Sequence, residues 1–204
     1  GSGKSITGFS VMGLVDPPGK IIDGNINFKG KDLSALSNDQ MQNIRGNRIA
    51  MIFQDPMMTL NPVLRIETQM IECIQAHDSS VSREDARIRS RDTLGLVGIS
   101  SPDERLRAYP HQFSGGMRQR VSIAIAMLNR PDLIIADEPT TALDVTIQGQ
   151  VISEMQKLCR ETQTALLWIT HDLAVVAGIA DRVCVIYAGR IVEQGLVANI
   201  IANP

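Results

Sequence analysis

Short runs of consecutive apolar residues alternate along the chain with longer stretches in which apolar residues recur at helical spacing. A short run bounded by turn residues predicts a strand, and helical spacing predicts an amphipathic helix. Strands are therefore expected at 20–29, 48–53, 133–136, 165–170 and 182–187. Helices are expected at 5–14, 38–45, 146–161 and 173–179. Strands that alternate with helices predict a parallel sheet with helices packed on it, which is an α/β fold.

The stretch from 66 to 128 interrupts this alternation. It contains two helical patterns rich in Arg and Glu, at 66–76 and 82–97, and no readable strand. A third helix is expected at 117–128. We therefore expect residues 66–128 to form a helical subdomain inserted into one domain that spans 1–204.

Composition and charge are those of an ordinary globular domain. The chain has 204 residues, of which 44% are hydrophobic and 21% charged, and this length supports a core of its own. The net charge of −2 and the aromatic content of 3% argue against nucleic acid as a partner. No apolar run approaches the roughly 20 residues that a membrane span needs. If the protein works at a membrane, we expect it to do so as a peripheral subunit.

The three cysteines, Cys73, Cys159 and Cys184, are far apart in the sequence and have no metal-ligand spacing. An odd count without a paired motif predicts a reducing compartment rather than a disulfide framework. Cys184 lies within the apolar run 183–186, so we expect its thiol to be buried and unreactive.

Gly3-Lys4-Ser5 reads as the end of a phosphate-binding loop. A helix N-terminus offers backbone N–H groups and a positive dipole end to a polyphosphate. In such a loop the lysine reaches the β- and γ-phosphates and the serine binds Mg²⁺. Alone, the tripeptide is equally consistent with a turn before a helix. The first half of the loop is missing from the sequence, so we expect a native chain cut at its start; a Gly1-Ser2 remnant of cloning is the alternative.

The expected strand at 133–136 ends in two acids, Asp137 and Glu138. Ligands bind beyond the carboxyl ends of strands in open α/β sheets. Asp137 is expected to hold Mg²⁺ through water, and Glu138 to polarise the water that attacks the γ-phosphate. The alternative is a solvated strand end with two surface carboxylates, which Pro139 and Asp144 nearby disfavour.

Ser114-Gly115-Gly116 opens the helix expected at 117–128 and creates a second helix end with bare N–H groups. Alone, this tripeptide is better explained as a helix cap. Arg118-Gln119-Arg120 directly after it, and the acidic strand end further on, favour a second phosphate-binding helix end.

Motifs of one family occur here in one order. They are Gly3-Lys4-Ser5, 113–120, 136–139, 141–144 and 170–172. Together they resemble the nucleotide-binding subunits of ATP-binding-cassette (ABC) transporters, over the whole length of the chain. Longer matches at 53–62, 109–120 and 136–146 resemble the oligopeptide, dipeptide and nickel importer branch. That branch often continues into a C-terminal extension, sometimes with cysteines that hold an iron–sulfur cluster, so we expect the chain to be cut at its end too.

The resemblance implies a P-loop NTPase fold, with a RecA-like core of the ABC type and the inserted helical subdomain. It implies ATP and Mg²⁺ as cofactors. The residues implied to bind ATP are Gly1, Ser2, Gly3, Lys4, Ser5 and Ile6, the last standing where many members carry Thr. The tripeptide Ser114, Gly115 and Gly116 is implied to cover the ATP held by a partner subunit. The implied Mg²⁺ ligands are Ser5, Gln54 and Asp137.

The resemblance also implies catalytic roles. Glu138 would act as the base, Gln54 would sense the γ-phosphate, and His171 would bond the γ-phosphate as a switch. Asp144 would organise the interface between two subunits. Without the resemblance, Gln54 reads as a turn residue and His171 as a structural or exposed histidine.

The implied function is ATP hydrolysis that powers import of peptides or a similar small solute. The implied partners are a second, homologous or identical ATPase subunit, permease subunits and, indirectly, an extracytoplasmic solute-binding protein. The expected location is the cytoplasmic face of the cell membrane. Two alternatives remain: a non-transport ABC ATPase, and a partner subunit that binds nucleotide without hydrolysing it. The presence of both Glu138 and His171 argues against the second.

Overall fold

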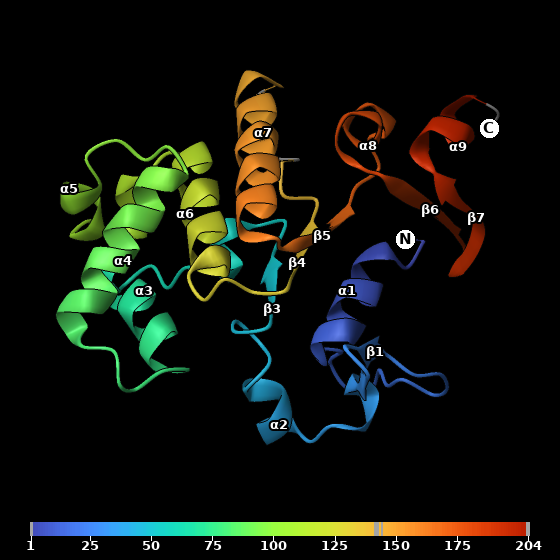
Figure 1. Ribbon diagram of the computed structural model, residues 1–204, viewed down its shortest axis with the longest axis horizontal. Helices are drawn as coiled ribbons and strands as arrows, with labels where there is room; N and C mark the ends of the chain where they lie inside the picture. Colours follow the sequence, from blue (N-terminus) through green and yellow to red (C-terminus); the bar gives the residue numbers. More distant parts are fainter. Residues whose placement is uncertain (1, 141–142, 144, 203–204) are drawn as a thin grey trace. The chain divides into compact units, whose positions relative to one another are not determined.

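The computed structural model describes residues 2–140, 143 and 145–202, which form two compact units (Figure 1). One unit contains the residues up to Gln42 together with those from Trp168 onward, and the other contains Asn43–Leu167. Gly1 and Asp144, two of the expected site residues, lie outside the described residues.

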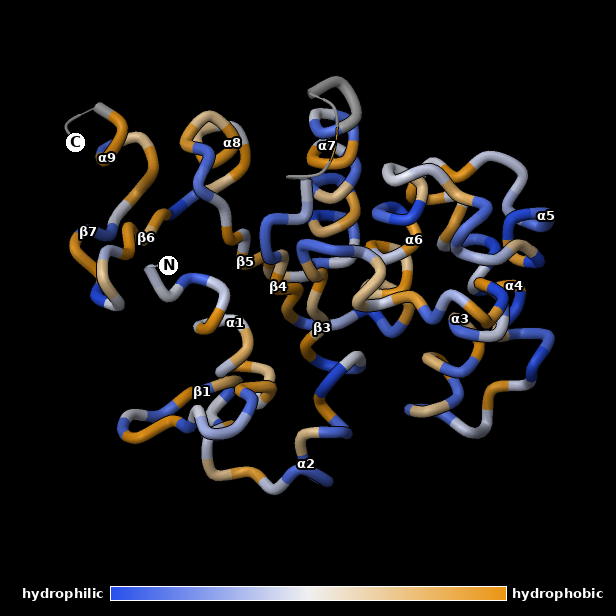
Figure 2. Tube along the Cα trace, turned by 180° about the vertical axis from the view of Figure 1, so that it is seen from behind, coloured by the Kyte–Doolittle hydropathy of each residue, from blue (hydrophilic) through white to orange (hydrophobic). Residues whose placement is uncertain are grey.

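A parallel strand pair forms the centre of the Asn43–Leu167 unit. Strand β3 (Ile49–Ile52) pairs in parallel with β4 (Leu133–Asp137), from Ile49 opposite Leu133 to Ile52 opposite Ala136. Strand β5 (Ala165–Ile169) follows in the order β3-β4-β5. Every residue of β3 is buried, and Figure 2 shows β3 and β4 as hydrophobic. The strands predicted at 48–53, 133–136 and 165–170 and the α/β fold class are thus confirmed.

Two long helices join or cover these strands. Helix α7 (Val145–Thr162) connects β4 to β5, and α6 (Gly115–Met127) precedes β4. Both were predicted from helical spacing, with ends that differ by two residues or fewer. No helix in the described part of the chain is both long and apolar enough to cross a membrane.

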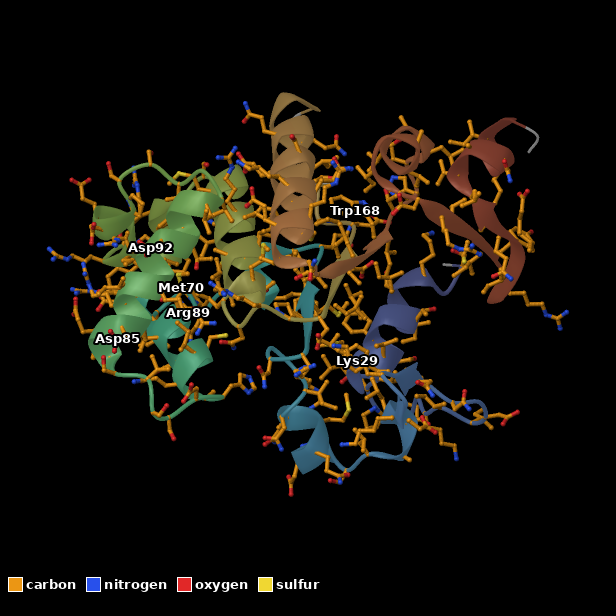
Figure 3. All side chains as sticks on the ribbon, viewed as in Figure 1. Lys29, Met70, Asp85, Arg89, Asp92 and Trp168 are labelled. Carbon is orange, nitrogen blue, oxygen red and sulfur yellow. The ribbon has the colours of Figure 1, made fainter. Side chains whose placement is uncertain are left out.

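The helices predicted at 66–76 and 82–97 are present. They are α3 (Ile66–Gln75) and α4 (Arg83–Leu96), and the Ser82 hydroxyl caps α4 by accepting a bond from the Asp85 amide at 3.1 Å. Met70, labelled in Figure 3, is fully buried. A short helix that the pattern did not reveal, α5 (Pro102–Leu106), follows α4. Two 3-10 turns, η2 (Pro56–Met58) and η3 (Pro110–Gln112), complete this region.

The other unit begins with α1 (Lys4–Met12), which was predicted. The predicted strand at 20–29 is mostly wrong, since only β1 (Asn27–Phe28) forms and it pairs antiparallel with β2 (Lys31–Asp32). Gly24, in the left-handed region at φ 94°, breaks the extended backbone before it. The turn η1 (Leu33–Ala35) and helix α2 (Asn38–Gln42) follow.

A β-hairpin closes this unit. Helix α8 (Leu173–Ile179) has the predicted bounds, and strand β6 (Arg182–Tyr187) pairs antiparallel with β7 (Arg190–Leu196) before α9 (Val197–Ala202). The two turn residues, Ala188 and Gly189, both have positive φ. Two such residues give the turn whose twist matches a hairpin. Within its unit, β6 thus pairs antiparallel with its sequence neighbour.

The cysteines differ in exposure. Cys159 on α7 is buried, whereas Cys184 on β6 is exposed, so the prediction of a buried Cys184 is wrong. Burial raises the pKa of the Cys159 thiol to about 11 and also raises that of Cys73. The apolar neighbours of Cys184 suggested that this strand is buried. In the two-stranded sheet, however, the Cys184 side chain lies on an exposed face.

We expect Cys184 to react with iodoacetamide at pH 8 at least tenfold faster than Cys159. The attacking species is the thiolate, and burial both lowers its population at Cys159 and blocks access. Peptide mass spectrometry of the folded protein over a time course measures the two rates. The unfolded protein is the control, in which the two cysteines should react alike. Equal rates in the folded protein contradict the expectation.

Candidate functional site

The Gly3-Lys4-Ser5 segment forms the N-terminal end of α1. Gly3 is the N-cap residue and takes the left-handed conformation, at φ 95° and ψ 7°. The Lys4 ammonium donates to the Ser2 hydroxyl at 3.1 Å. The Gly189 amide donates to the Ser2 carbonyl at 3.0 Å, which fixes the loop against the β6–β7 turn. Since first-turn amides have no acceptor within a helix, this end can present N–H donors and one ammonium group to an anion.

Ser5 and Ile6 lie next to this helix end and are exposed. The Thr7 hydroxyl donates to the Gly3 carbonyl at 2.9 Å. The first turn thus carries hydroxyl side chains at Ser5 and Thr7 and an apolar side chain at Ile6.

The two acids lie at the carboxyl end of β4. Asp137 is the last strand residue and only 5% exposed, and Glu138 follows with a left-handed backbone at φ 45°. Because Ile52 is opposite Ala136 in the parallel pair, Gln54 leaves β3 at the same edge. The Gln54 side-chain amide donates to the Glu138 carboxylate at 3.4 Å. The structure therefore brings together two residues to which the family resemblance assigns catalytic roles.

The turn after Glu138 is held by a contact that sequence reasoning missed. Thr140 is buried, and its hydroxyl accepts a hydrogen bond from the Gln148 side-chain amide at 2.9 Å. Gln148 lies in α7, so this bond ties the turn to the helix that follows it. No pattern along the sequence distinguishes Gln148 from the other polar residues of α7.

Ser114-Gly115-Gly116 forms the exposed start of α6. The Ser114 hydroxyl accepts from the Met117 amide at 3.3 Å, which is an ordinary N-cap bond. A β-carbon placed on Gly115 would meet no atom within 4 Å. The approach to Gly115 is therefore open. Arg118 steadies the preceding turn by donating from Nε to the Pro110 carbonyl at 3.0 Å.

His171 lies in the other unit, between β5 and α8. Its side chain is exposed. The next residue, Asp172, caps α8 by accepting from the Ala174 amide at 2.8 Å and the Val175 amide at 3.3 Å. This cap fixes the turn that presents His171. Lys4 and His171 thus belong to one unit, and Gln54, Asp137, Glu138 and Ser114 belong to the other.

The residues expected to hold Mg²⁺ offer suitable donor atoms. Ser5 supplies a hydroxyl, Gln54 an amide oxygen and Asp137 a carboxylate. Mg²⁺ prefers oxygen ligands, takes one or two carboxylates from the protein and completes its shell with phosphates and water. Asp137 is buried at a strand end, where a carboxylate needs positive charge or hydrogen-bond donors around it. The donor set therefore fits this ion.

Comparisons with known proteins agree with these motifs. A family model described as "ABC transporter" matches residues 1–141. The oligopeptide transport ATP-binding protein OppD of Bacillus subtilis is 52% identical over 100% of this chain, which covers 57% of that protein. The dipeptide transport ATP-binding protein DppD of Bacillus subtilis is also 52% identical over 100% of the chain, which covers 61% of it. The chain thus spans about three fifths of the length of these relatives.

Solved structures of similar fold include the dimeric post-hydrolysis state of the ATP-binding cassette MJ0796 bound to ADP and Pi. That structure has a TM-score of 0.83 and 27% identity, and the match covers 96% of this chain and 81% of that one. The predicted P-loop NTPase fold of the ABC type is confirmed by this likeness. With the family model matched over residues 1–141 and relatives at 52% identity, this chain belongs to the ABC transporter family.

Proposed function

We propose that this chain carries the ATP-hydrolysing site of an ABC transporter subunit, and that the subunit powers import of peptides or a similar small solute. The observation that carries the hydrolytic part is the contact between Gln54 and Glu138 at the end of two parallel strands. The similarity to peptide-transport ATP-binding proteins over the whole chain supports the solute class.

The start of α1 is the proposed binding site for the ATP phosphates. The Gly3 backbone and the first-turn amides would surround the phosphates, and Ser2, Gly1 and Ile6 would line the same loop. The Lys4 ammonium would leave the Ser2 hydroxyl and move to the β- and γ-phosphates, since a phosphate is a much stronger acceptor for a cation than a hydroxyl is. Ser2 thus keeps Lys4 at the helix end before ATP arrives.

Hydrolysis is assigned to the end of β4. The Glu138 carboxylate would accept a proton from the attacking water, while the Gln54 amide, already bonded to it, would orient that carboxylate and the water. Asp137, Ser5 and Gln54 would hold Mg²⁺, which when bound offsets the negative charge of the phosphates. His171, held by the capped turn before α8, would donate to the γ-phosphate and report its presence.

The proposed working unit contains two ATPase subunits. The open helix end at 114–116 would cover the nucleotide of the partner subunit, and Asp144 would lie in the interface. The helices in 66–128 would form the subdomain that carries this helix end. The dimeric state of the MJ0796 cassette with ADP and Pi supports such an arrangement. Permease subunits would anchor the pair at the cytoplasmic face of the membrane and receive solute from a binding protein.

Reconstitution of the intact subunit with its permease in liposomes tests this proposal. We expect ATP-dependent uptake of a labelled peptide, and turnover that rises when peptide-loaded binding protein is added. Peptide-free binding protein and a Lys4→Ala subunit are the controls, because the alanine removes the ammonium that meets the phosphates. Hydrolysis without uptake of peptide, nickel or another small solute points to a non-transport ATPase and contradicts the import part. ATP binding without turnover contradicts the hydrolytic part.

A further inference from the structure

The Arg120 guanidinium joins three segments of the Asn43–Leu167 unit. One nitrogen, Nη1, donates to the Gly98 carbonyl at 3.0 Å, in the turn that follows α4. The other, Nη2, donates to the Gln150 side-chain oxygen at 3.1 Å and lies 3.6 Å from the Glu154 carboxylate, both on α7. Arg120 itself belongs to α6, which Figures 1 and 2 both place between α4 and α7. A planar fork with fixed donors suits such a three-way contact.

The Arg120 guanidinium packs closely against Gly98. Gly98 has φ 72°, and a β-carbon on it would lie 2.6 Å from Arg120 Nη1 and 3.0 Å from a Glu154 carboxylate oxygen. The Arg120 side chain is 15% exposed, so its ion pair is screened less than a surface pair. Burial raises the pKa of the Glu154 carboxyl, and the positive charge of Arg120 opposes that rise. Arg120, Gly98, Gln150 and Glu154 therefore form a well-packed polar contact, called the Arg120 junction below, rather than an exposed ion pair.

Both ends of this junction lead to proposed site residues. On α6, Arg120 lies less than two turns after Ser114, whose helix end is open to a partner's nucleotide. On α7, Gln150 lies close to Gln148, whose amide bonds the Thr140 hydroxyl in the turn just after Glu138. A displacement of the α6 start can thus reach the Glu138 turn through two rigid helices and three side-chain bonds.

We propose that Arg120 is a positioning residue that couples the 114–116 helix end to the Glu138 turn of the same chain. Engagement of the helix end with a partner's nucleotide would fix α6, and the Arg120 junction would then fix α7 and, through Gln148, the turn that presents Glu138. Glu138 of each chain would therefore be aligned for hydrolysis only when the 114–116 helix end of that chain contacts a partner's nucleotide. This inference rests on the proposed ATPase function.

A double-mutant cycle on the intact, reconstituted transporter tests the junction. Arg120→Gln and Glu154→Gln are each expected to lower kcat for ATP hydrolysis about fivefold or more, with KM for ATP within about twofold. The double variant is expected to fall no further than Arg120→Gln alone, because both changes break one contact. Arg91→Gln and Glu161→Gln are the matched controls, since the half-buried Arg91 and the exposed Glu161 pair with the neighbouring Asp92 and Lys157, away from the junction, and kcat should stay unchanged.

Gly98→Ala provides a second route to the same contact. Its β-carbon displaces the guanidinium, so kcat should fall as in Arg120→Gln, but Gly98→Ala should change kcat little in the Arg120→Gln background. Alanine at the positive φ of Gly98 is strained, so Gly98→Ala should lower Tm by the same amount in the wild type and in the Arg120→Gln variant. An effect on kcat that appears only in the wild type therefore comes from the junction and not from this strain. Arg120→Lys keeps the charge but not the fork, so we expect kcat between that of Arg120→Gln and wild type. If Arg120→Gln does not fold, the cycle of Gly98→Ala with Glu154→Gln replaces it, with the same non-additivity expected.

The outcomes separate this inference from the proposed function. A wild-type transporter without ATP turnover contradicts the proposed function. Wild-type turnover together with normal kcat in the Arg120 and Glu154 variants overturns the junction alone. Additive losses in the double variant, or losses that follow Tm and shift KM as much as kcat, show a structural role only and also overturn it. The junction is supported if kcat falls in the single variants, KM for ATP stays unchanged and the losses in the double variant are not additive.

Discussion

A Glu138→Gln subunit is expected to bind ATP as tightly as the wild-type subunit and to hydrolyse it ~10²–10⁴-fold more slowly. The substitution keeps the size of the side chain and one oxygen that the Gln54 amide can meet, but it removes the charge that accepts a proton from water. The helix end at Lys4, where we propose that the phosphates bind, is not altered. Binding and hydrolysis should therefore separate.

Calorimetry with Mg-ATP and a phosphate-release assay on the intact subunit measure the two properties. Glu161→Gln is the matched control, because it makes the same chemical change at an exposed position of α7. Turnover of Glu138→Gln within twofold of wild type would falsify the assignment of Glu138 as the base. A loss of ATP affinity together with turnover would instead assign Glu138 to nucleotide binding.

Ser114→Arg is expected to abolish ATP-driven pairing and hydrolysis while sparing ATP binding by the same chain. Ser114 and Gly115 are exposed, and a β-carbon on Gly115 would meet no atom within 4 Å, so the arginine should not disturb the fold. A long side chain there blocks the close approach that glycine allows. The residues proposed to bind the phosphates, from Gly1 to Ile6, are unchanged. Loss of ATP binding by the isolated Ser114→Arg chain would reject a site shared between two subunits.

A mixing experiment sharpens this test where two copies of the chain pair. Ser114→Arg and Lys4→Ala are each expected to be inactive alone. In a mixed pair, one site combines an intact Lys4 with an intact Ser114, and the other site carries both defects. Partial recovery of turnover on mixing is therefore expected, measured beside tagged copies that prove the mixed pair forms. No recovery in proven mixed pairs contradicts two independent shared sites.

Local sequence patterns predicted most elements of both units. The apolar run at 48–53 becomes β3, and the spacing at 66–76 and 82–97 becomes α3 and α4. The helix expected at 38–45 starts directly after Ser37, whose hydroxyl accepts from the Gln40 amide at 3.3 Å. These features depend on residues close in the sequence, for which propensity, periodicity and capping carry enough information.

Features that depend on distant residues were missed or wrong. The alternating pattern at 20–29 has the strand period, but strand formation needs a partner, and only Asn27–Phe28 finds one. The antiparallel pairing of β6 with β7, through a turn in which Ala188 and Gly189 have positive φ, was not predicted.

In the candidate site, too, single residues were predicted from the sequence, whereas the contacts between them were not. Its residues were predicted individually from motifs, and these roles stay predictions, but the contact of Gln54 with Glu138 depends on strand register. The bond from Gln148 to Thr140 and the junction at Arg120 join helices and turns far apart in the sequence. No local pattern encodes such pairings, because each residue alone has many equally suitable neighbours.

The left-handed backbone at Glu138 lowers the stability of the fold at the residue for which we propose a catalytic role. A residue with a β-carbon costs roughly 1–2 kcal/mol in this conformation relative to glycine, which adopts it freely. Folding alone would thus favour glycine directly after β4, whereas the role proposed for Glu138 requires a carboxylate there. A Glu138→Gly change would then raise thermodynamic stability while it removes the proposed base, and so gives one route to a more stable but inactive cassette.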